Sequence, residues 1–269
     1  MCELLGMSSS LPATLNLSLT ELARHGGPPT LIRDGWGVAY YEGPDVRLIK
    51  DAGPADKSDW IGFLRDHPLQ SSIVVAHIRK ATIGERAYRN TQPFTRELAG
   101  RTHLFAHNGW LPGIFDTERF RSADYAPVGE TDSEQAFCGL LDRLQELWHR
   151  PGVIPPLDAR LSVVSSFAAE MRSLGPANFL YSDGETLFAH GDRRKQAASA
   201  KVEPPGLVFL ERRCGEEAQV LSANGVSVKV SEQTITLVAS VPLTGEPWEA
   251  LAEGEVIAIS KGEVTRSPN

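Results

Sequence analysis

The stretch SEQAFCGLLDRLQELWH, residues 133–149, has the apolar spacing of a helix that packs one face against a core. Thr131 and Asp132 stand just before it, and both residue types are favoured at a helix N-terminus. Residues 160–174 repeat the apolar pattern and are followed by Gly175 and Pro176, which together stop a helix. Two amphipathic helices in the middle of the chain therefore organise the predicted fold. The apolar positions of the first are Ala136, Phe137, Leu140, Leu141, Leu144 and Leu147.

Predicted strands lie on both sides of this helical centre. Residues 72–78, SIVVAHI, are a continuous apolar and β-branched run, which indicates a strand buried on both faces. Shorter helices are predicted at residues 15–25 and 60–66. Helices placed between an early and a late set of strands predict an α+β layered fold. The other predicted strands cover residues 2–7, 37–41, 46–50, 103–107, 178–182, 186–190, 206–210, 234–240 and 256–260, with a turn at 42–45.

Composition and charge exclude several classes of protein. The 269 residues are 41% hydrophobic and 23% charged, which is ordinary for a globular chain. No Pro/Gly/Ser-rich or highly charged linker divides them, so one large domain is predicted. The formal net charge of −7 argues against a broad nucleic-acid or anionic-membrane surface. No apolar run approaches the ~20 residues of a membrane span, and no secretory signal is evident, so we expect a cytoplasmic protein.

Three cysteines, an odd number spread far apart, do not suggest a disulfide framework. Cys138 falls within the apolar helical pattern, where a cysteine is usually a small buried hydrophobe. Cys214 follows a polar stretch and is expected to be a surface or turn thiol. Neither explanation applies to Cys2.

Cys2 acquires a distinctive chemistry once Met1 is removed, which methionine aminopeptidase does when the second residue is small. One residue then carries both a thiol and a free α-amino group. An α-amine has a pKa of about 7.7–8.0, against about 10.4 for lysine, so part of it is neutral at pH 7 and can act as a general base. Enzymes with N-terminal nucleophiles use this arrangement. The alternative is a chance cysteine beside the start codon.

Three further segments carry polar groups suited to binding and cleaving an amino-acid amide. Arg79 follows the buried strand and can bind a carboxylate through two parallel hydrogen bonds. Asn108 and Gly109 offer an amide and a backbone N–H that can stabilise an oxyanion. Asp132 can accept from an ammonium group. The simpler readings are a surface ion pair, a hairpin turn and a helix N-cap, respectively.

Taken in order, six segments resemble the class II glutamine amidotransferases, the N-terminal-nucleophile glutaminases of glucosamine-6-phosphate synthase and amidophosphoribosyltransferase. The resemblance is strongest to stand-alone bacterial members without a synthase domain, and it covers nearly the whole chain, including the tail at 239–249. The segments are MCELLG (1–6), DGWG (34–37), HIR (77–79), NTQPF (90–94), HNG (107–109) and ETDSE (130–134).

The resemblance implies a four-layer αββα sandwich of the N-terminal nucleophile hydrolase type. Residues 2–269 would form a single glutamine amidotransferase type-2 domain after removal of Met1. The implied reaction hydrolyses the side-chain amide of glutamine, or a γ-glutamyl amide, through a Cys2 thioester. Ammonia or an amine is then released, or ammonia passes to a separate synthase; no cofactor and no metal are implied. Cys2 would be nucleophile and base, Asn108 and Gly109 the oxyanion hole, and Arg79, Thr82 and Asp132 the substrate-binding residues.

The chain departs from the synthase-linked members at four positions near these motifs. It has Lys80 where they have tryptophan, and Asp34 where they have arginine. Ile83 and Gln92 stand where they have histidine. The implied catalytic residues are unaffected, but strict specificity for glutamine is no longer implied.

Metal and nucleotide binding are disfavoured by spacing. His103 and His107 would lie about 13 Å apart along a strand, too far to share a zinc ion. Residues 35–37, GWG, lack the third glycine and the helix start of a phosphate loop. We expect His77 and His107 to be hydrogen-bonded core residues.

Two other functions remain open. One is a non-catalytic amino-acid-binding subunit of a larger complex, and the other is an N-terminal nucleophile acylase for another amide. Arg79 together with Asp132 favours an amino-acid substrate over the apolar substrates of acylases. Cys2 together with Asn108 favours an enzyme over a binding subunit.

Overall fold

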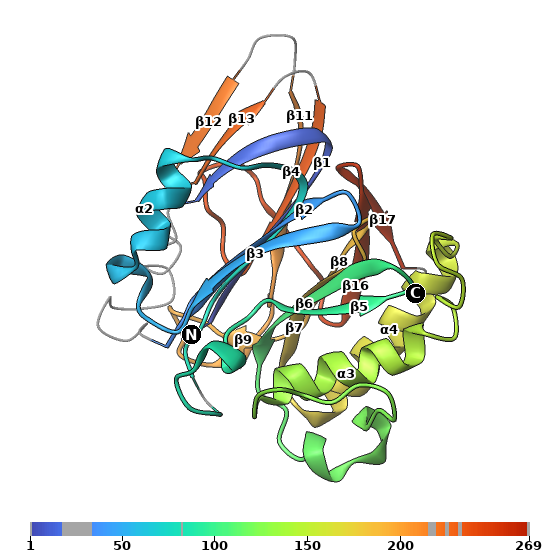
Figure 1. Ribbon diagram of the computed structural model, residues 1–269. Helices are drawn as coiled ribbons and strands as arrows, with labels where there is room; N and C mark the ends of the chain where they lie inside the picture. The colour runs from blue at the N-terminus through green and yellow to red at the C-terminus, as the bar shows by residue number, and fades with distance from the viewer. Residues whose placement is uncertain are drawn as a thin grey trace.

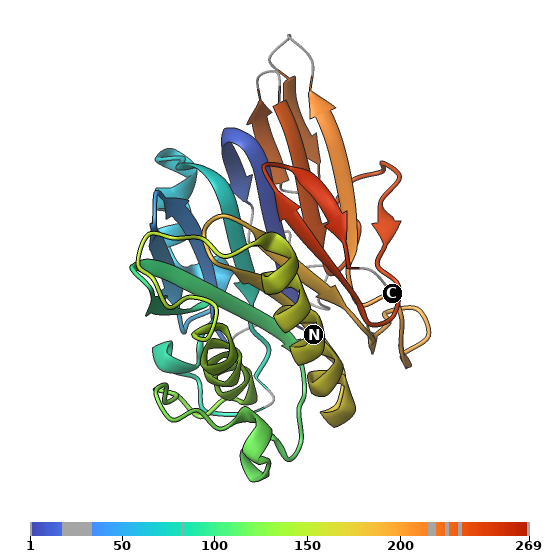
Figure 2. The ribbon, with the colours of Figure 1, turned by 90° about the vertical axis from the view of Figure 1, so that its right-hand side faces the viewer.

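The computed structural model of the chain describes residues 2–17, 34–81, 83–214, 219–223, 226–230 and 233–267. Met1, Thr82 and most of the helix predicted at 15–25 lie outside these residues. Two β-sheets lie face to face, with helices on their outer sides (Figures 1 and 2). None of the described helices is long and apolar enough to cross a membrane.

Within the described residues the larger sheet has nine strands, with β1 (Glu3–Leu17) in its middle. β1 pairs antiparallel with β4 (Gln70–Ile78) and β14 (Gln233–Ala239). The strand order is β15-β11-β14-β1-β4-β2-β3, and β13 joins the far end of β1 and carries β12. The remaining strands are β2 (Trp36–Glu42), β3 (Asp45–Asp51), β11 (Val208–Cys214), β12 (Gln219–Ala223), β13 (Val226–Val230) and β15 (Glu249–Ala250).

The smaller sheet has six strands in the described part of the chain, in the order β17-β16-β8-β7-β6-β5. A separate two-stranded ribbon pairs β9 with β10. The strands are β5 (Phe94–Leu98), β6 (Arg101–Gly109), β7 (Ala177–Ser182), β8 (Leu187–Gly191), β9 (Arg194–Lys195), β10 (Val202–Glu203), β16 (Glu255–Ser260) and β17 (Glu263–Arg266).

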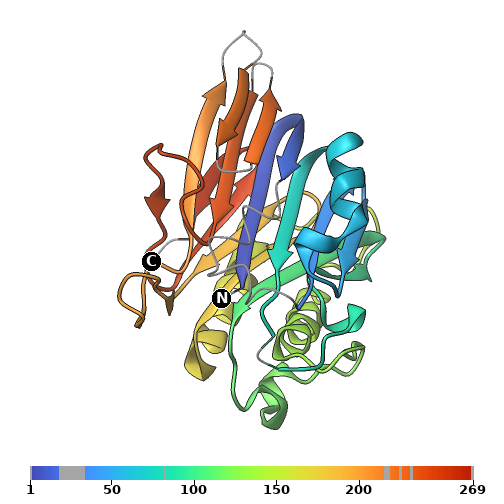
Figure 3. The same ribbon diagram turned by 90° about the vertical axis from the view of Figure 1, so that its left-hand side faces the viewer.

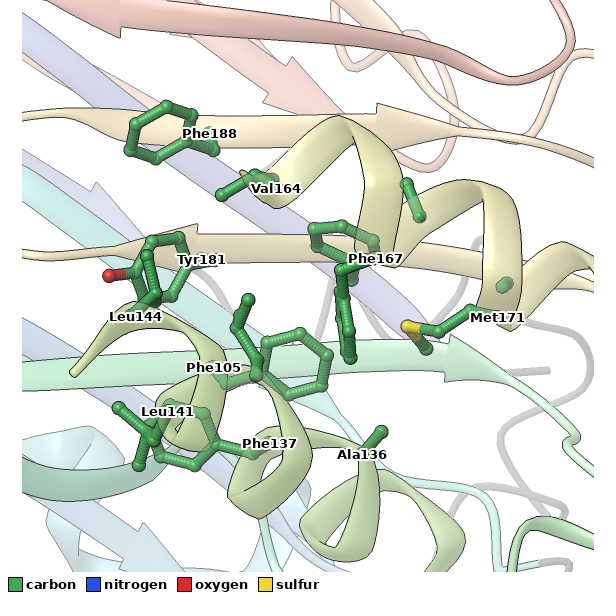
Figure 4. Packing of buried hydrophobic residues seen from close by; sticks show 14 of the residues in the cluster. Phe105, Ala136, Phe137, Leu141, Leu144, Val164, Phe167, Met171, Tyr181 and Phe188 are labelled. Atoms are coloured by element: carbon green, nitrogen blue, oxygen red, sulfur yellow. The ribbon is translucent and has the colours of Figure 1, made fainter. Parts of the chain in front are cut away.

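Helices α3 (Asp132–Leu144) and α4 (Leu157–Leu174) cover the outer face of the smaller sheet (Figure 2). An aromatic core fills this interface, as Figure 4 shows. Phe105 of β6 stacks on Phe137 of α3 with ring centroids 5.5 Å apart. The apolar stripe predicted for each helix therefore packs against the sheet. Short 3-10 helices occur at η2 (Ala55–Lys57), η3 (Tyr88–Asn90), η4 (Ile114–Asp116) and η5 (Glu118–Phe120).

Alternate residues of β1 and β4 point into two different cores, because successive side chains of a strand face opposite sides. Leu4 and Val75 belong to the core between the two sheets. Leu5 and Val74 belong to the core on the outer face of the larger sheet, where α2 (Asp59–Asp66) packs (Figure 3). The predicted strand buried on both faces is confirmed, and the layers form the predicted αββα sandwich.

Two predicted elements differ from the structure. The helix predicted at 15–25 is wrong at residues 15–17, because these extend β1 and pair with β13. The helix predicted to reach residue 149 ends at Leu144. The Leu147 N–H donates to the Leu144 carbonyl in a tighter turn, and Trp148 then packs into the core. Short or edge strands such as β5 and β17 were not predicted, since their sequences carry little alternation.

Candidate active site

Cys2 lies immediately before β1, beside the end of β4. Because Glu3 pairs with Ile78, the register of these strands places the thiol next to the residues that follow β4. The Cys2 Sγ accepts a hydrogen bond from the Lys80 backbone N–H at 3.1 Å and lies 3.3 Å from the Lys80 carbonyl oxygen. The residue is partly buried.

Burial raises the pKa of the Cys2 thiol, and the hydrogen bond from the Lys80 backbone offsets only part of this increase. The thiol is therefore protonated at neutral pH. Since the thiolate is the reactive form, attack on a substrate needs a base close to the sulfur. Met1, which precedes Cys2 in the chain, lies outside the described residues.

A buried ion pair directly behind Cys2 fixes the start of β1. Glu3 is fully buried, and its Oε1 accepts from the Arg194 Nη2 at 2.8 Å. Arg194 also donates to the Ser240 carbonyl, and the Ser240 hydroxyl accepts from the Leu4 N–H at 2.9 Å. Sequence reasoning missed this anchor, because Glu3 and Arg194 stand 191 residues apart and no local pattern links them.

Asn108 reaches Cys2 from the end of β6. Its Nδ2 donates to the Cys2 carbonyl oxygen at 2.7 Å. The residue pairs with Asn178 inside the β6–β7 ladder, so the hairpin-turn reading is wrong. Asn178, which the sequence analysis did not single out, donates to the Asn108 carbonyl at 3.1 Å and supports it from β7. An asparagine amide carries two N–H groups, and the bond to Cys2 occupies one of them.

Gly109 is the last residue of β6, and only glycine fits there because the Pro176 carbonyl lies so close to its backbone. A Cβ there would lie 2.0 Å from the Pro176 carbonyl oxygen. The Trp110 N–H donates to that same oxygen at 3.2 Å. Successive N–H groups along an antiparallel strand point alternately toward and away from the neighbouring strand, so the Gly109 N–H points away from β7. The His107 N–H points the same way and donates to the Gln92 Oε1 at 2.6 Å.

Arg79 is only 3% exposed, which rules out the surface ion pair. Its Nη1 donates to the Asp34 and Glu85 carbonyls, each at 3.2 Å. Its Nη2 donates to the Ile83 carbonyl at 2.9 Å and the Gly84 carbonyl at 3.2 Å. These four hydrogen bonds therefore fix the loop after β4 around the guanidinium. The Asp34 carboxylate adds a bond from the Ala81 N–H at 2.9 Å.

Asp132 is the first residue of α3, and it is 4% exposed. The N-cap is Thr131, whose side chain accepts from the Glu134 N–H at 3.2 Å, so the N-cap reading of Asp132 is wrong. The Asp132 carboxylate instead accepts from the Leu111 N–H at 2.9 Å and the Ser133 N–H at 2.8 Å. It thereby joins the start of α3 to the segment that follows β6.

The two histidines expected to be core residues are both buried. His107 meets the Ser133 Oγ at 2.9 Å, which confirms the expectation of a hydrogen bond. His77 lies against the His107 backbone, and neither of its ring nitrogens makes a well-aligned hydrogen bond to a described residue. Burial lowers the pKa of His77 to about 3, so its ring is neutral.

A cleft of about 300 Å³ opens beside Cys2. It is bordered by the ends of β6 and β7 and by the β9–β10 ribbon. Arg79 and Asp132 do not line it. The cleft residues are Cys2, Lys80, Asn108, Gly109, Trp110, Pro176, Asn178, Arg193, Arg194, Lys195 and Val202.

The two packed sheets with outer helices form a sandwich of the N-terminal nucleophile hydrolase type, and comparison with known proteins gives the family. Residues 1–269 match the family model described as glutamine amidotransferases class-II. The chain belongs to the class II glutamine amidotransferases, as the sequence motifs predicted.

Individual relatives agree with this family over the full length of the chain. It is 39% identical to YafJ of Escherichia coli strain K12, over 98% of this chain and 99% of YafJ. The crystal structure of a predicted glutamine amidotransferase from Pseudomonas aeruginosa is 35% identical, with a TM-score of 0.73 over 98% of this chain and 99% of that one. Glutamine phosphoribosylpyrophosphate amidotransferase of B. subtilis, at 14% identity and a TM-score of 0.56, covers 98% of this chain and 48% of its own, which is a likeness of fold alone.

Proposed function

We propose that Cys2, exposed by removal of Met1, hydrolyses the side-chain amide of glutamine or a γ-glutamyl amide through a thioester. The family makes glutamine amide chemistry the general activity. The observation that supports the finer proposal most is the meeting of three groups at the N-terminus of the central strand. These are the Cys2 thiol, the Lys80 N–H and the Asn108 amide.

In the proposed first step the neutral α-amine of Cys2 takes the thiol proton. The thiolate then attacks the γ-carbonyl carbon and forms a C–S bond. Negative charge grows on the carbonyl oxygen, where the second Asn108 N–H and the Gly109 N–H would stabilise it. Collapse of this intermediate breaks the C–N bond, and the α-ammonium returns its proton to the departing nitrogen.

In the second step water hydrolyses the thioester. The α-amine takes a proton from the water as its oxygen attacks the carbonyl carbon. The C–S bond breaks, the sulfur regains a proton from the α-ammonium, and glutamate leaves. The first step needs a base because burial raises the pKa of the Cys2 thiol, and the second needs one because neutral water is a weak nucleophile.

We assign the substrate α-carboxylate to Arg79 and Thr82, and the α-ammonium to Asp132. A carboxylate has about four lone-pair sites, so Asp132 can accept from an ammonium while it keeps the Leu111 N–H. Arg79 has five N–H groups, and four point at backbone carbonyls. Forked binding of a carboxylate by Arg79 therefore requires residues 83–85 to give up part of these contacts.

We further propose that the reaction takes place in the cytoplasm. In the simplest form of the proposal, the ammonia or amine that the reaction forms is released to water. The alternative fate is transfer of ammonia to a separate synthase. Measuring free ammonia with glutamine alone, and again with each candidate acceptor, separates these fates.

Labelling with a glutamine analogue tests the proposed nucleophile. Active protein should lack one methionine by intact mass, and diazo-oxo-norleucine should add covalently to Cys2. Cys2→Ala should neither take the label nor release ammonia. Label on Cys138 or Cys214, or full activity in protein that retains Met1, would contradict the mechanism. A non-catalytic binding subunit would bind glutamine in calorimetry and release no ammonia.

A further inference from the structure

Cys2 stands at an end of β1 that extends beyond the neighbouring strand β14. The β1–β14 ladder ends at Leu5, whereas pairing with β4 on the other side continues to Glu3. On the β14 side Ser240, the residue that follows β14, continues the contact. Its N–H donates to the Leu4 carbonyl at 3.1 Å, and its hydroxyl accepts from the Leu4 N–H at 2.9 Å. Whatever holds Ser240 therefore also holds the end of the strand that carries Cys2.

Arg194 holds this end of β1 at two points. Its Nη1 donates to the Ser240 carbonyl, and its Nη2 donates to the Glu3 Oε1 at 2.8 Å. The Arg194 and Glu3 side chains are only 3% and 0% exposed. A buried ion pair is weak evidence for stability, because the cost of taking two charges out of water offsets much of their attraction. The pair is therefore better explained by the geometry that it fixes than by the stability that it adds.

The two residues just before Arg194 support Asn108 through Asn178. The Asn178 Nδ2 donates to the Asn108 carbonyl at 3.1 Å and to the Arg193 carbonyl at 2.8 Å. The Asn178 Oδ1 accepts from the Asp192 N–H at 2.8 Å. Three consecutive residues of the chain therefore support both the strand end that carries the thiol and the strand end that carries the asparagine amide.

We infer that the Glu3–Arg194 pair positions Cys2 for attack, by holding the end of β1 in register with Asn108. The inference rests on the proposed function. Both residues of the pair are positioning residues, because they act through the backbone of β1 and make no contact with the reacting atoms. A misplacement of about 1 Å can lower a rate by about 100-fold. Loss of the pair should therefore lower kcat and leave KM nearly unchanged, since the residues proposed to bind the substrate are untouched.

The test replaces both charges at once. Glu3→Met/Arg194→Met leaves no buried charge without its partner, and replacing a buried ion pair by apolar side chains of similar volume is often neutral for stability. The double variant cannot donate to the Ser240 carbonyl, so the end of β1 loses its fixed position. We expect a cooperative thermal melt, a kcat for ammonia release from glutamine lowered by about 100-fold, and a KM within a few-fold of wild type.

A second buried ion pair supplies the matched control. Arg160 and Asp183, with side chains 5% and 0% exposed, lie 2.6 Å apart, and neither lines the cleft beside Cys2. Arg160→Met/Asp183→Asn removes both charges, and asparagine keeps the oxygen that accepts from the Glu185 and Thr186 N–H groups. This variant should keep kcat within a few-fold of wild type. A fall of about 100-fold here would mean that losing any buried pair slows the enzyme, which contradicts the inference.

Two milder variants decide the question if the double variant does not fold. Ser240→Ala keeps both charges and removes only the hydroxyl that accepts from the Leu4 N–H. Arg194→Lys keeps the positive charge beside Glu3 but loses the fork that reaches two acceptors. Each should lower kcat, by less than the double variant, with KM unchanged. Wild-type kcat in both would show that the contacts of Arg194 and Ser240 do not position the thiol.

The outcomes separate this inference from the proposed function. A folded double variant with wild-type kcat would overturn the inference and leave the proposed function standing. A raised KM at constant kcat would do the same, because Arg194 lines the cleft and would then act in substrate binding. No Cys2-dependent hydrolysis of glutamine or of γ-glutamyl amides by the wild-type protein would overturn the proposed function, and this inference with it.

Discussion

Two pairs of charged residues differ in their surroundings: one pair is buried and hydrogen-bonded by the protein, and the other is partly or fully open to solvent. Arg79 and Asp132 are 3% and 4% exposed, and backbone groups occupy both side chains. Lys80 is half-buried and Lys195 exposed, and neither pairs with a described acid. Arg79 and Asp132, the inner charges, hold loops and a helix in place, while Lys80 and Lys195, the outer charges, form no ion pair with a described residue.

This difference predicts which substitutions affect folding as well as substrate binding. A buried acceptor left without its donor costs about 1–3 kcal/mol, whereas a surface substitution away from such features usually changes stability by less than about 0.5 kcal/mol. At the inner charges, stability and substrate affinity should therefore change together. At the two outer lysines, stability should change little.

The largest expected effect is at Asn108. If its amide stabilises the oxyanion, Asn108→Ala should lower kcat by about 100- to 1,000-fold and leave KM within a few-fold. Asn108→Gly should lose a similar amount, because β6 is a strand here and no turn favours glycine. Steady-state kinetics on glutamine, with folding checked by thermal melts, test whether the Asn108 amide acts in the reaction. Near-wild-type rates in both variants would remove Asn108 from the chemistry.

Arg79→Lys should affect both binding and stability. Lysine keeps the charge but loses the planar fork that reaches four backbone carbonyls. We expect KM for glutamine to rise more than kcat falls, with about 1–3 kcal/mol lost from the free energy of unfolding. Arg47→Lys is the control, because the Arg47–Glu42 pair is exposed. A fall in kcat at constant KM would show that the carboxylate clamp is misplaced.

Asp132→Asn should have a smaller effect in the same direction. The amide retains one acceptor oxygen, so it cannot serve both the Leu111 and Ser133 N–H groups, and it removes a negative charge from the first turn of α3. The charge alone contributes about 0.3–1 kcal/mol to the helix. Urea unfolding should detect this loss, and KM for glutamine should rise. Unchanged KM would place the substrate ammonium elsewhere.

The smallest effect on stability is expected at Lys195. Lys195→Gln should change the free energy of unfolding by less than about 0.5 kcal/mol, because the side chain is exposed and lies on a two-residue strand. Chemical denaturation of Lys195→Gln beside Arg79→Lys tests the contrast directly. Equal losses in the two variants would mean that the outer lysines are as structural as the inner charges.

Local patterns in the sequence predicted much of the fold. The apolar periodicity of residues 133–149 and 160–174 predicted α3 and α4, because a helix brings every third or fourth residue to one face. The run SIVVAHI predicted β4 as buried on both faces. At residues 15–17, where the local pattern predicted a helix, pairing with the distant β13 gives a strand.

The sequence by itself determined the family and the layer architecture, and it predicted Cys2 as the nucleophile, since each depends on residues close together in the chain or on motifs in a fixed order. Only the tertiary structure decided which groups surround that cysteine. The Glu3–Arg194 anchor joins residues 191 positions apart, and the cleft beside Cys2 combines Lys80 with residues after β8. The Arg79 guanidinium takes its partners from the loop after β4 and from Asp34. Such neighbours depend on strand pairing and sheet packing over the whole chain, and no short window of sequence records them.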